Sequence, residues 1–303
     1  MSNQSAIRQQ ITDQIMESLT HGKLPPWRRP WSDDPNAPGL HTSLSSGDAY
    51  RGINQLVLQL SASQQNFQSK WWGTYNQISN SGASVRRGQK ATKIVLWKPV
   101  SRIRANKDGK DVKDSFMIMR KFSVFNAEQT TGMDEFRVGY AQSAVDTGER
   151  YEHANQVIEA TDADIRHGGN AAFYSPQHDF IQCPFRHQFN SAEEYLGTVF
   201  HEICHWAEHA ERLNWDRKNN GYAMGELIAE IGSCFIMSEL GLPTADNMEN
   251  HAAYVKNWMK GMQDDPKFIF RAAAQAAKAT DFILHFSRSP ESEAEPELEE
   301  VPF

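Results

Sequence analysis

The sequence predicts a two-domain α+β protein, and three observations support this fold class. The chain has 303 residues, which is long for a single hydrophobic core and comfortable for two domains. The two halves differ in charge, because residues 1–139 carry 19 Lys and Arg against 11 Asp and Glu, whereas residues 140–303 carry 12 against 27. The apolar residues follow both helix and strand periods in the first half and mainly the helix period in the second.

Residues 1–139 are expected to fold as a basic, mixed α+β domain. Its first helix is indicated by apolar residues at every fourth position, namely Ile7, Ile11, Ile15 and Leu19. In order, the expected elements are a helix over Ser5–Thr20, a loop from Pro26 to Asp48, a helix over Gly52–Ser63, and strands over Thr92–Val100 and Phe116–Asn126. Asp108-Gly109 lies between the two strands and favours a hairpin turn.

Residues 140–152 lose the hydrophobic pattern and are the expected linker to a mainly helical domain with a small sheet over residues 153–286. In order, its expected elements are extended pieces at Phe173-Tyr174 and Asp179–Cys183 and helices over Ala192–Leu213, Met224–Leu240, Glu249–Met262 and Pro266–Phe286. Residues 287–303 hold six glutamates and three prolines, so they bury too little apolar surface and are expected to form a disordered acidic tail.

Composition excludes two classes of protein. No apolar run approaches the roughly eighteen residues of a membrane span, so no membrane partner is expected. The first ten residues lack the basic-then-apolar layout of a secretory signal, which predicts a cytoplasmic protein. Cys183, Cys204 and Cys234 are odd in number and form no CxxC pair, so they are interpreted as reduced thiols rather than as a disulfide framework.

The segment His201-Glu202-Ile203-Cys204-His205 predicts a metal site of the metallopeptidase kind. On a helix, residues four apart share a face, so His201 and His205 can present two imidazoles to one ion while Glu202 projects beside them. Zn²⁺ is the expected ion, and another divalent transition metal such as Mn²⁺ is the alternative. Zinc lowers the pKa of its bound water to about 7, and Glu202 would be the catalytic base that accepts the proton.

The third metal ligand is expected on a later helix. Metzincins would require Gly at position 208 and His at position 211, and this chain has Glu208 and Glu211. Glu226 and Glu230 lie four apart, beginning 21 residues after His205, and share a helical face. Glu226 is assigned as the ligand and Glu230 as the acceptor for an imidazole N–H of a metal-binding histidine. The reverse assignment of these two glutamates stays open.

The basic half also predicts binding of single-stranded DNA. Residues 70–121 contain 13 Lys and Arg but only three acidic residues, interleaved with aromatic side chains. Positive charge tracks phosphates, and aromatic faces stack on bases. The candidate contacts are Trp27, Arg28, Trp31, Trp71, Trp72, Arg86, Arg87, Lys90, Lys93, Trp97 and Lys98. The alternative is that most of these aromatic residues belong to the core of the half-domain and that the basic run around Arg102–Lys113 is a solvated hairpin.

The chain resembles the ArdC-type antirestriction proteins of conjugative plasmids. In the first half the motifs that carry this resemblance are Pro26–Trp31, Tyr50–Asn54, Trp71–Tyr75, Arg87–Lys90 and Val124–Gln129. In the second half they are Phe173–Pro176, His201–Trp206, Arg212–Asn214 and Glu226–Glu230. The resemblance implies a single-stranded-DNA-binding domain, a SprT-related metallopeptidase domain and protection of incoming plasmid DNA from host restriction. Ala207-Glu208-His209 departs from the Thr-Gly-His expected in that family.

Two functional hypotheses follow. In the first, the protein is a zinc metallopeptidase that cleaves a protein substrate found on or near the single-stranded DNA it binds. In the second, it is a non-catalytic DNA-binding protector whose metal site is structural or vestigial.

Overall fold

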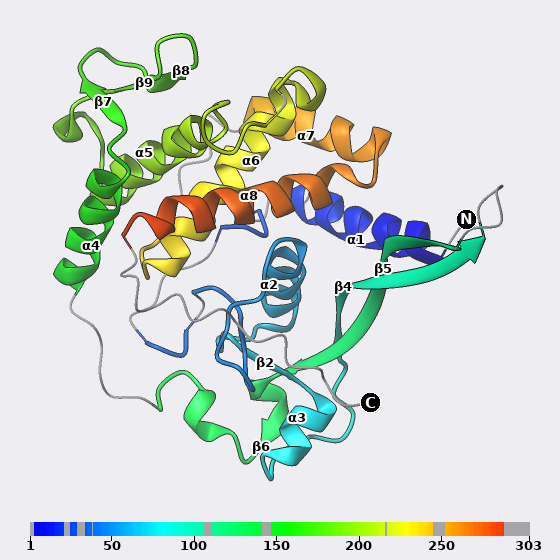
Figure 1. Ribbon diagram of the computed structural model, residues 1–303. Helices are drawn as coiled ribbons and strands as arrows, with labels where there is room; N and C mark the ends of the chain where they lie inside the picture. Colours follow the sequence, from blue (N-terminus) through cyan, green and yellow to red (C-terminus); the bar gives the residue numbers. More distant parts are fainter. Residues whose placement is uncertain are drawn as a thin grey trace.

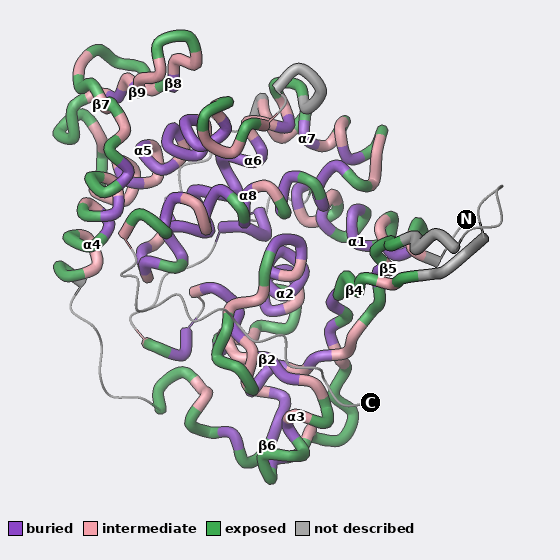
Figure 2. Tube along the Cα trace, in the orientation of Figure 1, coloured by how far each residue is buried: buried purple, intermediate pink, exposed green. Residues whose placement is uncertain are grey.

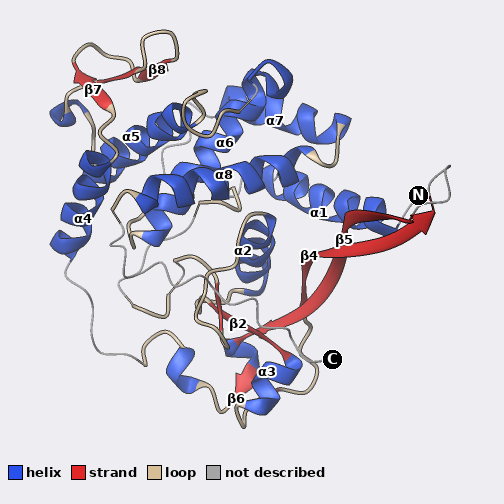
Figure 3. Cartoon of the chain, in the orientation of Figure 1, coloured by secondary structure: helices blue, strands red, loops and turns tan. Residues whose placement is uncertain are grey.

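The computed structural model describes residues 3–20, 25–28, 34–37, 39–105, 111–140, 147–215, 217–244 and 252–287. Figure 1 shows a body of helices with a small sheet at one side and a long β-hairpin arm at the other. In Figure 3 the longer strands belong to the first half of the chain, and helices dominate the second. The predicted α+β fold with two parts is confirmed.

The first half combines helices with a mixed sheet. Its helices are α1 (Asn3–Thr20), α2 (Ile53–Gln65) and α3 (Tyr75–Asn80). The strands of the larger sheet are β1 (Thr42–Ser43), β2 (Trp71–Thr74), β4 (Thr92–Ala105) and β5 (Asp111–Asn126), in the order β1-β2-β5-β4. Strand β1 pairs with β2 in parallel, and the other pairs in this sheet are antiparallel. The short strands β3 (Ser84–Val85) and β6 (Thr130–Thr131) pair with each other.

Strands β4 and β5 form the arm. Their register runs without interruption from Thr92 opposite Val124 to Ala105 opposite Asp111. Both strands are longer than predicted, because cross-strand pairing extends them over Ser101–Ala105 and Asp111–Ser115, which contain many polar and charged residues. The predicted turn at Asp108-Gly109 lies outside the described residues.

The second half consists of helices and a small sheet. Its helices are α4 (Thr147–Ala160), α5 (Ala192–Ala207), α6 (Arg217–Glu239), α7 (Ala252–Asp264) and α8 (Phe268–His285). The strands β7 (Asp164–His167), β8 (Phe173–Ser175) and β9 (Phe180–Cys183) form a sheet in the order β7-β9-β8. Strand β7 pairs with β9 in parallel and β8 pairs with β9 antiparallel, which leaves β8 at an edge.

Helix boundaries in the second half also differ from those predicted. The helix expected over Ala192–Leu213 ends at Ala207, because Glu208 caps it and the chain then turns, with Asn214 in the left-handed region at φ 49°. Residues 147–152, predicted to belong to the linker, form the start of α4, whose polar first turn carries no apolar period. Residues 288–303 of the expected tail lie outside the described residues, and the predicted domain limits stay predictions.

One hydrophobic core cluster contains residues from both halves of the chain. The apolar stripe of α1 is confirmed, and Ile7, Ile11 and Ile15 are buried in a cluster with residues of α6, α7 and α8. A second cluster packs α5 against α4, the small sheet, α6 and α8. Figure 2 shows buried positions concentrated on α5, α6 and α8. The first half of the chain therefore lies directly against α6, one of the two helices that carry the predicted metal site. Among the described helices, none is long and apolar enough to cross a membrane.

Candidate metal centre

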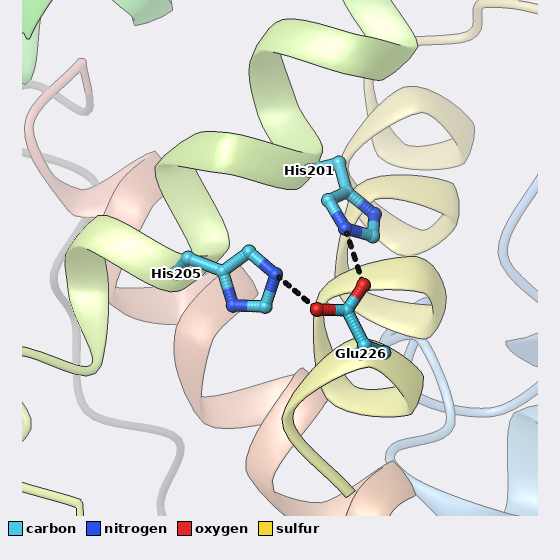
Figure 4. Close-up of side chains that lie close together, drawn as sticks. All are labelled: His201, His205 and Glu226. Carbon is cyan, nitrogen blue, oxygen red and sulfur yellow. Dashed lines mark ion pairs between the residues drawn. The ribbon is translucent and has the colours of Figure 1, made fainter. Parts of the chain in front are cut away.

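Helix α5 presents the histidines of the predicted motif. The Ser191 side chain caps its N-terminus by accepting a hydrogen bond from the Glu194 backbone N–H at 3.1 Å. Its apolar side is fully buried and consists of Leu196, Val199, Phe200 and Ile203. This packing fixes the rotation of the helix, so His201 and His205 both face α6 (Figure 4).

Helix α6 supplies the carboxylate. The backbone leaves helical geometry at Gly221, where φ is 69° and ψ is 162°, and the regular helix begins after it. The helices α5 and α6 come close at Gly232, because a Cβ there would lie only 2.7 Å from Sγ of Cys204. The missing side chain lets the helices approach, and Glu226 then lies opposite the two histidines (Figure 4).

The three side chains converge on one point. Nε2 of His201 lies 3.6 Å from Oε2 of Glu226, and Nε2 of His205 lies 3.6 Å from Oε1 of the same carboxylate. One ligand atom from each residue lies within 4.8 Å of the others. Two imidazole nitrogens and one carboxylate oxygen are a donor set suited to a divalent transition metal with an open coordination position. Among the described residues, no other His, Cys, Asp and Glu side chains form such a group.

The charges at this point favour a protonated histidine while no metal is bound. Burial disfavours the charged imidazole, but Glu226, Glu202 and Glu230 outweigh it and raise the pKa of His201 above its ordinary value. Burial alone would raise the pKa of Glu226, yet His201 and His205 hold that pKa below its usual range. The cluster is therefore already an ion-paired network in which a cation can replace a proton.

Glu202 and Glu230 occupy different positions around the three ligands. Glu202 is 8% exposed and lines the same cavity as the histidines. Glu230 is buried, and its Oε1 accepts hydrogen bonds from Nε1 of Trp27 at 3.2 Å and from Nε of Arg28 at 3.0 Å. The sequence links neither donor to the metal site, because both come from the opposite half of the chain. That Glu230 accepts from an imidazole stays a prediction.

Glu208 is a site residue that the sequence reasoning missed. It is 4% exposed, directly follows α5, and places Oε1 3.5 Å from Nδ1 of His205. In the sequence it stands out only because it occupies the position at which metzincins have glycine. Its spacing of three residues from His205 was the available signal.

A cavity of about 650 Å³ opens onto the candidate ligands. One wall is the edge strand β8, through Phe173 and Tyr174. Another wall is aromatic and includes Tyr222, whose hydroxyl lies 3.0 Å from that of Tyr254. The hydrogen bond with Tyr254, together with burial and the nearby Glu226, raises the pKa of Tyr222, so its phenol stays protonated near neutral pH.

Arg212 ties the small sheet to the end of α5. Its Nε donates to the Trp206 carbonyl at 2.6 Å, and its terminal nitrogens bond to Asp179 and to the hydroxyl of Tyr174. The guanidinium of Arg212 lowers the pKa of Asp179 to about 2, despite burial and with help from Tyr174. These contacts hold β8 beside the cavity.

The structure divides the predicted DNA contacts into three groups. Trp27, Arg28 and Trp72 are wrong as contacts, because all three are buried and their polar atoms bond within the protein: Trp27 and Arg28 to Glu230, and Nε1 of Trp72 to His41 at 3.0 Å. Trp71 is half-buried, with its Nε1 bonded to Asn36 at 2.8 Å. The exposed candidates, whose contact with DNA stays a prediction, are Arg86, Arg87, Lys90, Lys93, Trp97 and Lys98. Trp31 lies outside the described residues.

The arm exposes further apolar side chains that were not singled out as DNA contacts. Leu96, Phe116 and Met117 are 43%, 47% and 50% exposed. Residues directly opposite each other share a face of a hairpin, so Leu96 with Arg120, Lys98 with Ile118, and Val100 with Phe116 line one face. This mixture of apolar and cationic groups becomes visible only once the strand register is known.

The fold and the site together define a class of protein. A helix with two histidines, a glutamate from the next helix and an antiparallel edge strand beside them make the second half a zincin-like metallopeptidase domain. A family model described as zincin-like metallopeptidase matches residues 152–275. A second model, described as the N-terminal domain of anti-restriction factor ArdC, matches residues 5–125.

The chain belongs to the ArdC antirestriction family, as its resemblance to that family predicts. Crystal structures of antirestriction protein ArdC from plasmid R388 superpose on 93% of this chain at 34% identity. The metal-free structure has a TM-score of 0.75 and the Mn(II)-bound structure one of 0.74, with 97% and 98% of those chains covered. An uncharacterized protein, y4eC of Sinorhizobium fredii, is 30% identical, with 91% of each chain covered.

Longer relatives also contain this unit. Two Escherichia coli proteins named DNA primase TraC are 40% and 36% identical over 92% of this chain. The chain spans only 27% and 20% of their lengths.

Proposed function

We propose that this protein binds single-stranded DNA and carries a divalent-metal peptidase centre, and that it protects incoming plasmid DNA from host restriction. The observation that carries the peptidase part is the convergence of His201, His205 and Glu226 in a cavity that also contains Glu202. Zn²⁺ is the ion we propose, and the Mn(II)-bound structure of the ArdC relative supports a divalent metal cofactor.

The proposed chemistry divides between the ion and the side chains. When bound, the ion polarises a carbonyl group and lowers the pKa of a coordinated water. Glu202 accepts a proton as general base and returns it to the leaving amine as general acid. The Tyr222 phenol, whose raised pKa keeps it protonated, lines the same cavity and can donate a hydrogen bond to a developing oxyanion.

The cavity walls support a peptide as the proposed substrate. Strand β8 is an edge of its sheet, so one row of its backbone groups faces away from β9. An extended peptide can pair with such an edge through main-chain hydrogen bonds. Arg212 holds this strand in place by bonding Tyr174 and Asp179. A peptide paired with β8 would run along the cavity wall beside Glu202.

A Glu202→Gln variant tests whether proteolysis is the mechanism. Glutamine keeps the shape but cannot accept the proton, so we expect metal and DNA affinity to persist while cleavage and protection of DNA from restriction in cells are both lost. If the variant still protects DNA, the metal centre serves a structural purpose and the second functional hypothesis holds. Glu211→Ala, an exposed acidic position nearby, is the matched control and should keep full protection.

The arm is the proposed site for single-stranded DNA. Phe116 and Lys98 are exposed on one face of the arm and Trp97 on the other, so each face offers an aromatic ring. The second half of the chain is acidic and would repel DNA. The similarity to parts of two proteins named DNA primase supports a unit that acts near DNA.

Substitutions on the arm test this DNA site. We expect Trp97→Ala and Phe116→Ala each to weaken single-strand binding by about 1–3 kcal/mol, since each removes a stacking surface. Tyr75→Ala, at a more exposed aromatic residue on α3, is the control and should change little. Lys98→Ala should reduce the slope of log affinity against log salt by about 0.7. Equal affinity of the protein for single and double strands would contradict the stacking argument.

A further inference from the structure

A metal-binding histidine needs a partner for its second ring nitrogen, because that partner fixes the tautomer and the orientation of the ring. His205 turns Nε2 toward Glu226, and its Nδ1 lies 3.5 Å from Oε1 of Glu208. We propose that Glu208 is the positioning residue for His205, and that it accepts the Nδ1–H so that Nε2 presents its lone pair to the ion. This inference rests on the proposed role of His205 as a metal ligand.

The geometry places the imidazole of His205 between two carboxylates. Oε1 of Glu208 lies 3.5 Å from Nδ1, and Oε1 of Glu226 lies 3.6 Å from Nε2 on the other side of the ring. The Glu208 backbone is also fixed, because its N–H donates to the His205 carbonyl and its own carbonyl accepts from the Trp215 N–H, both at 3.2 Å.

Folding alone gives little reason for a glutamate at this position. Glu208 is the C-terminal cap of α5, where the helix dipole disfavours negative charge. It is also 4% exposed, and a buried carboxylate is costly unless it is paired. Both costs act against Glu208, and the nearby imidazole offsets them by supplying a polar partner inside the site.

Glu230 satisfies a different need, although it also lies close to the ligands. Its Oε1 is held by Trp27 and Arg28 and so connects the first half of the chain to α6. Glu208 instead lies on the helix that carries both histidines, three residues beyond His205. Removal of Glu208 should therefore disturb one ligand without detaching the two halves.

The test combines metal affinity with the tautomer of His205. We expect Glu208→Ala to weaken Zn²⁺ affinity, measured by competition with a chromogenic chelator, by about 10–100-fold. Glu208→Gln keeps an acceptor oxygen at the same place and should recover most of that loss. Glu211→Ala removes the same charge from an exposed position and should stay within about twofold of wild type. Unchanged affinity in both Glu208 variants would overturn the proposal.

Nitrogen-15 NMR of the metal-free protein provides a readout that does not depend on the ion. In a neutral imidazole of His205, the Glu208 carboxylate favours a proton on Nδ1 and the Glu226 carboxylate favours one on Nε2. At a pH where the imidazole is neutral, we therefore expect the share of the Nδ1–H form to fall in Glu208→Ala relative to the wild type and to Glu208→Gln. An unchanged share in Glu208→Ala would overturn the proposal. If the wild type binds no Zn²⁺, the peptidase centre fails, and the difference between the variants still decides whether Glu208 positions His205. Should the alanine variant not fold, a glutamine variant with the wild-type share supports the contact, and one with a smaller share contradicts it.

Discussion

At the scale of single residues, the centre is a charged network before any ion arrives. His201, His205 and Glu226 bring two imidazoles and a carboxylate within 4.8 Å, and Glu202 and Glu230 add negative charge around them. A metal ion must displace the protons that this network attracts, since histidine binds metal only when it is neutral.

The raised pKa of His201 predicts how metal affinity depends on pH. An ordinary histidine has a pKa near 6.5, and the pKa of His201 is raised above that value. Protons should therefore compete with Zn²⁺ for His201 above pH 6.5, so Zn²⁺ affinity should still increase with pH in that range. In the metal-free protein, protonation of His201 stabilises the fold. This contribution is fully present below the pKa that His201 has in the unfolded chain, and it is lost as the pH rises through the higher pKa that His201 has in the folded protein. An NMR titration of His201 with a midpoint at or below 6.5 would contradict this account.

The sequence predicts the three ligands but not the residues that hold them. The spacing of His201 and His205 gives their common face directly, and Glu226 follows from the need for a third ligand on a later helix. The role of Glu208 depends on where α5 ends. The pairing of Arg28 with Glu230 joins residues about 200 positions apart in the sequence. Neither feature follows from the local periodicity of apolar residues. Burial of Trp27 and Trp72 depends on tertiary packing in the same way.

At the scale of elements, the distance between α5 and α6 determines whether the ligands meet. Gly232 permits the close approach, because any Cβ there would clash with Sγ of Cys204 at 2.7 Å. The sequence predicts both helices from their apolar periods, yet the role of this glycine appears only when the two helices are placed together.

Substitution of Gly232 tests this packing. We expect Gly232→Ala to lower the free energy of unfolding by about 1–3 kcal/mol through overpacking, and to weaken metal affinity by displacing Glu226. Gly197→Ala in α5 is the control, because a Cβ there meets nothing within 4 Å and alanine stabilises a helix by about 0.5–1 kcal/mol relative to glycine. Both free energies can be measured by urea denaturation. Equal stability of the two variants would show that the helices are not in tight contact at Gly232.

At the scale of the whole molecule, the first half of the chain completes the surroundings of the metal centre. Helix α1 packs against α2 and α7 and shares a core cluster with residues of α6 and α8. Arg28 lines the cavity and pairs with Glu230. Charge asymmetry along the sequence correctly separates a basic half from an acidic half. The charge asymmetry does not reveal that the two halves share a core. The apolar stripe of α1 predicts a buried face but does not indicate which helices cover that face.

The pair of Arg28 and Glu230 should therefore contribute to the stability of the whole chain. Removal of one partner leaves a buried charge uncompensated, so we expect Arg28→Ala to lower the free energy of unfolding by about 3–5 kcal/mol. The double variant Arg28→Met, Glu230→Leu removes both charges and should be much closer to wild type. Arg87→Ala, at an exposed position, controls for the loss of an arginine. If Arg28→Ala had the same free energy of unfolding as the wild type in urea denaturation, that result would contradict a stabilising buried pair of Arg28 and Glu230.

The central claim is that His201, His205 and Glu226 hold one divalent ion. The most direct test is to measure the metal content of the purified wild-type protein and of the Glu226→Ala variant by elemental mass spectrometry. We expect about one divalent transition metal per wild-type chain and less than about a tenth of that in the variant, because two imidazoles alone leave the ion too few ligands. The circular dichroism spectra of the two proteins should be the same. Equal metal content in the two proteins, or none in the wild type after loading with Zn²⁺ and Mn²⁺, would contradict the claim.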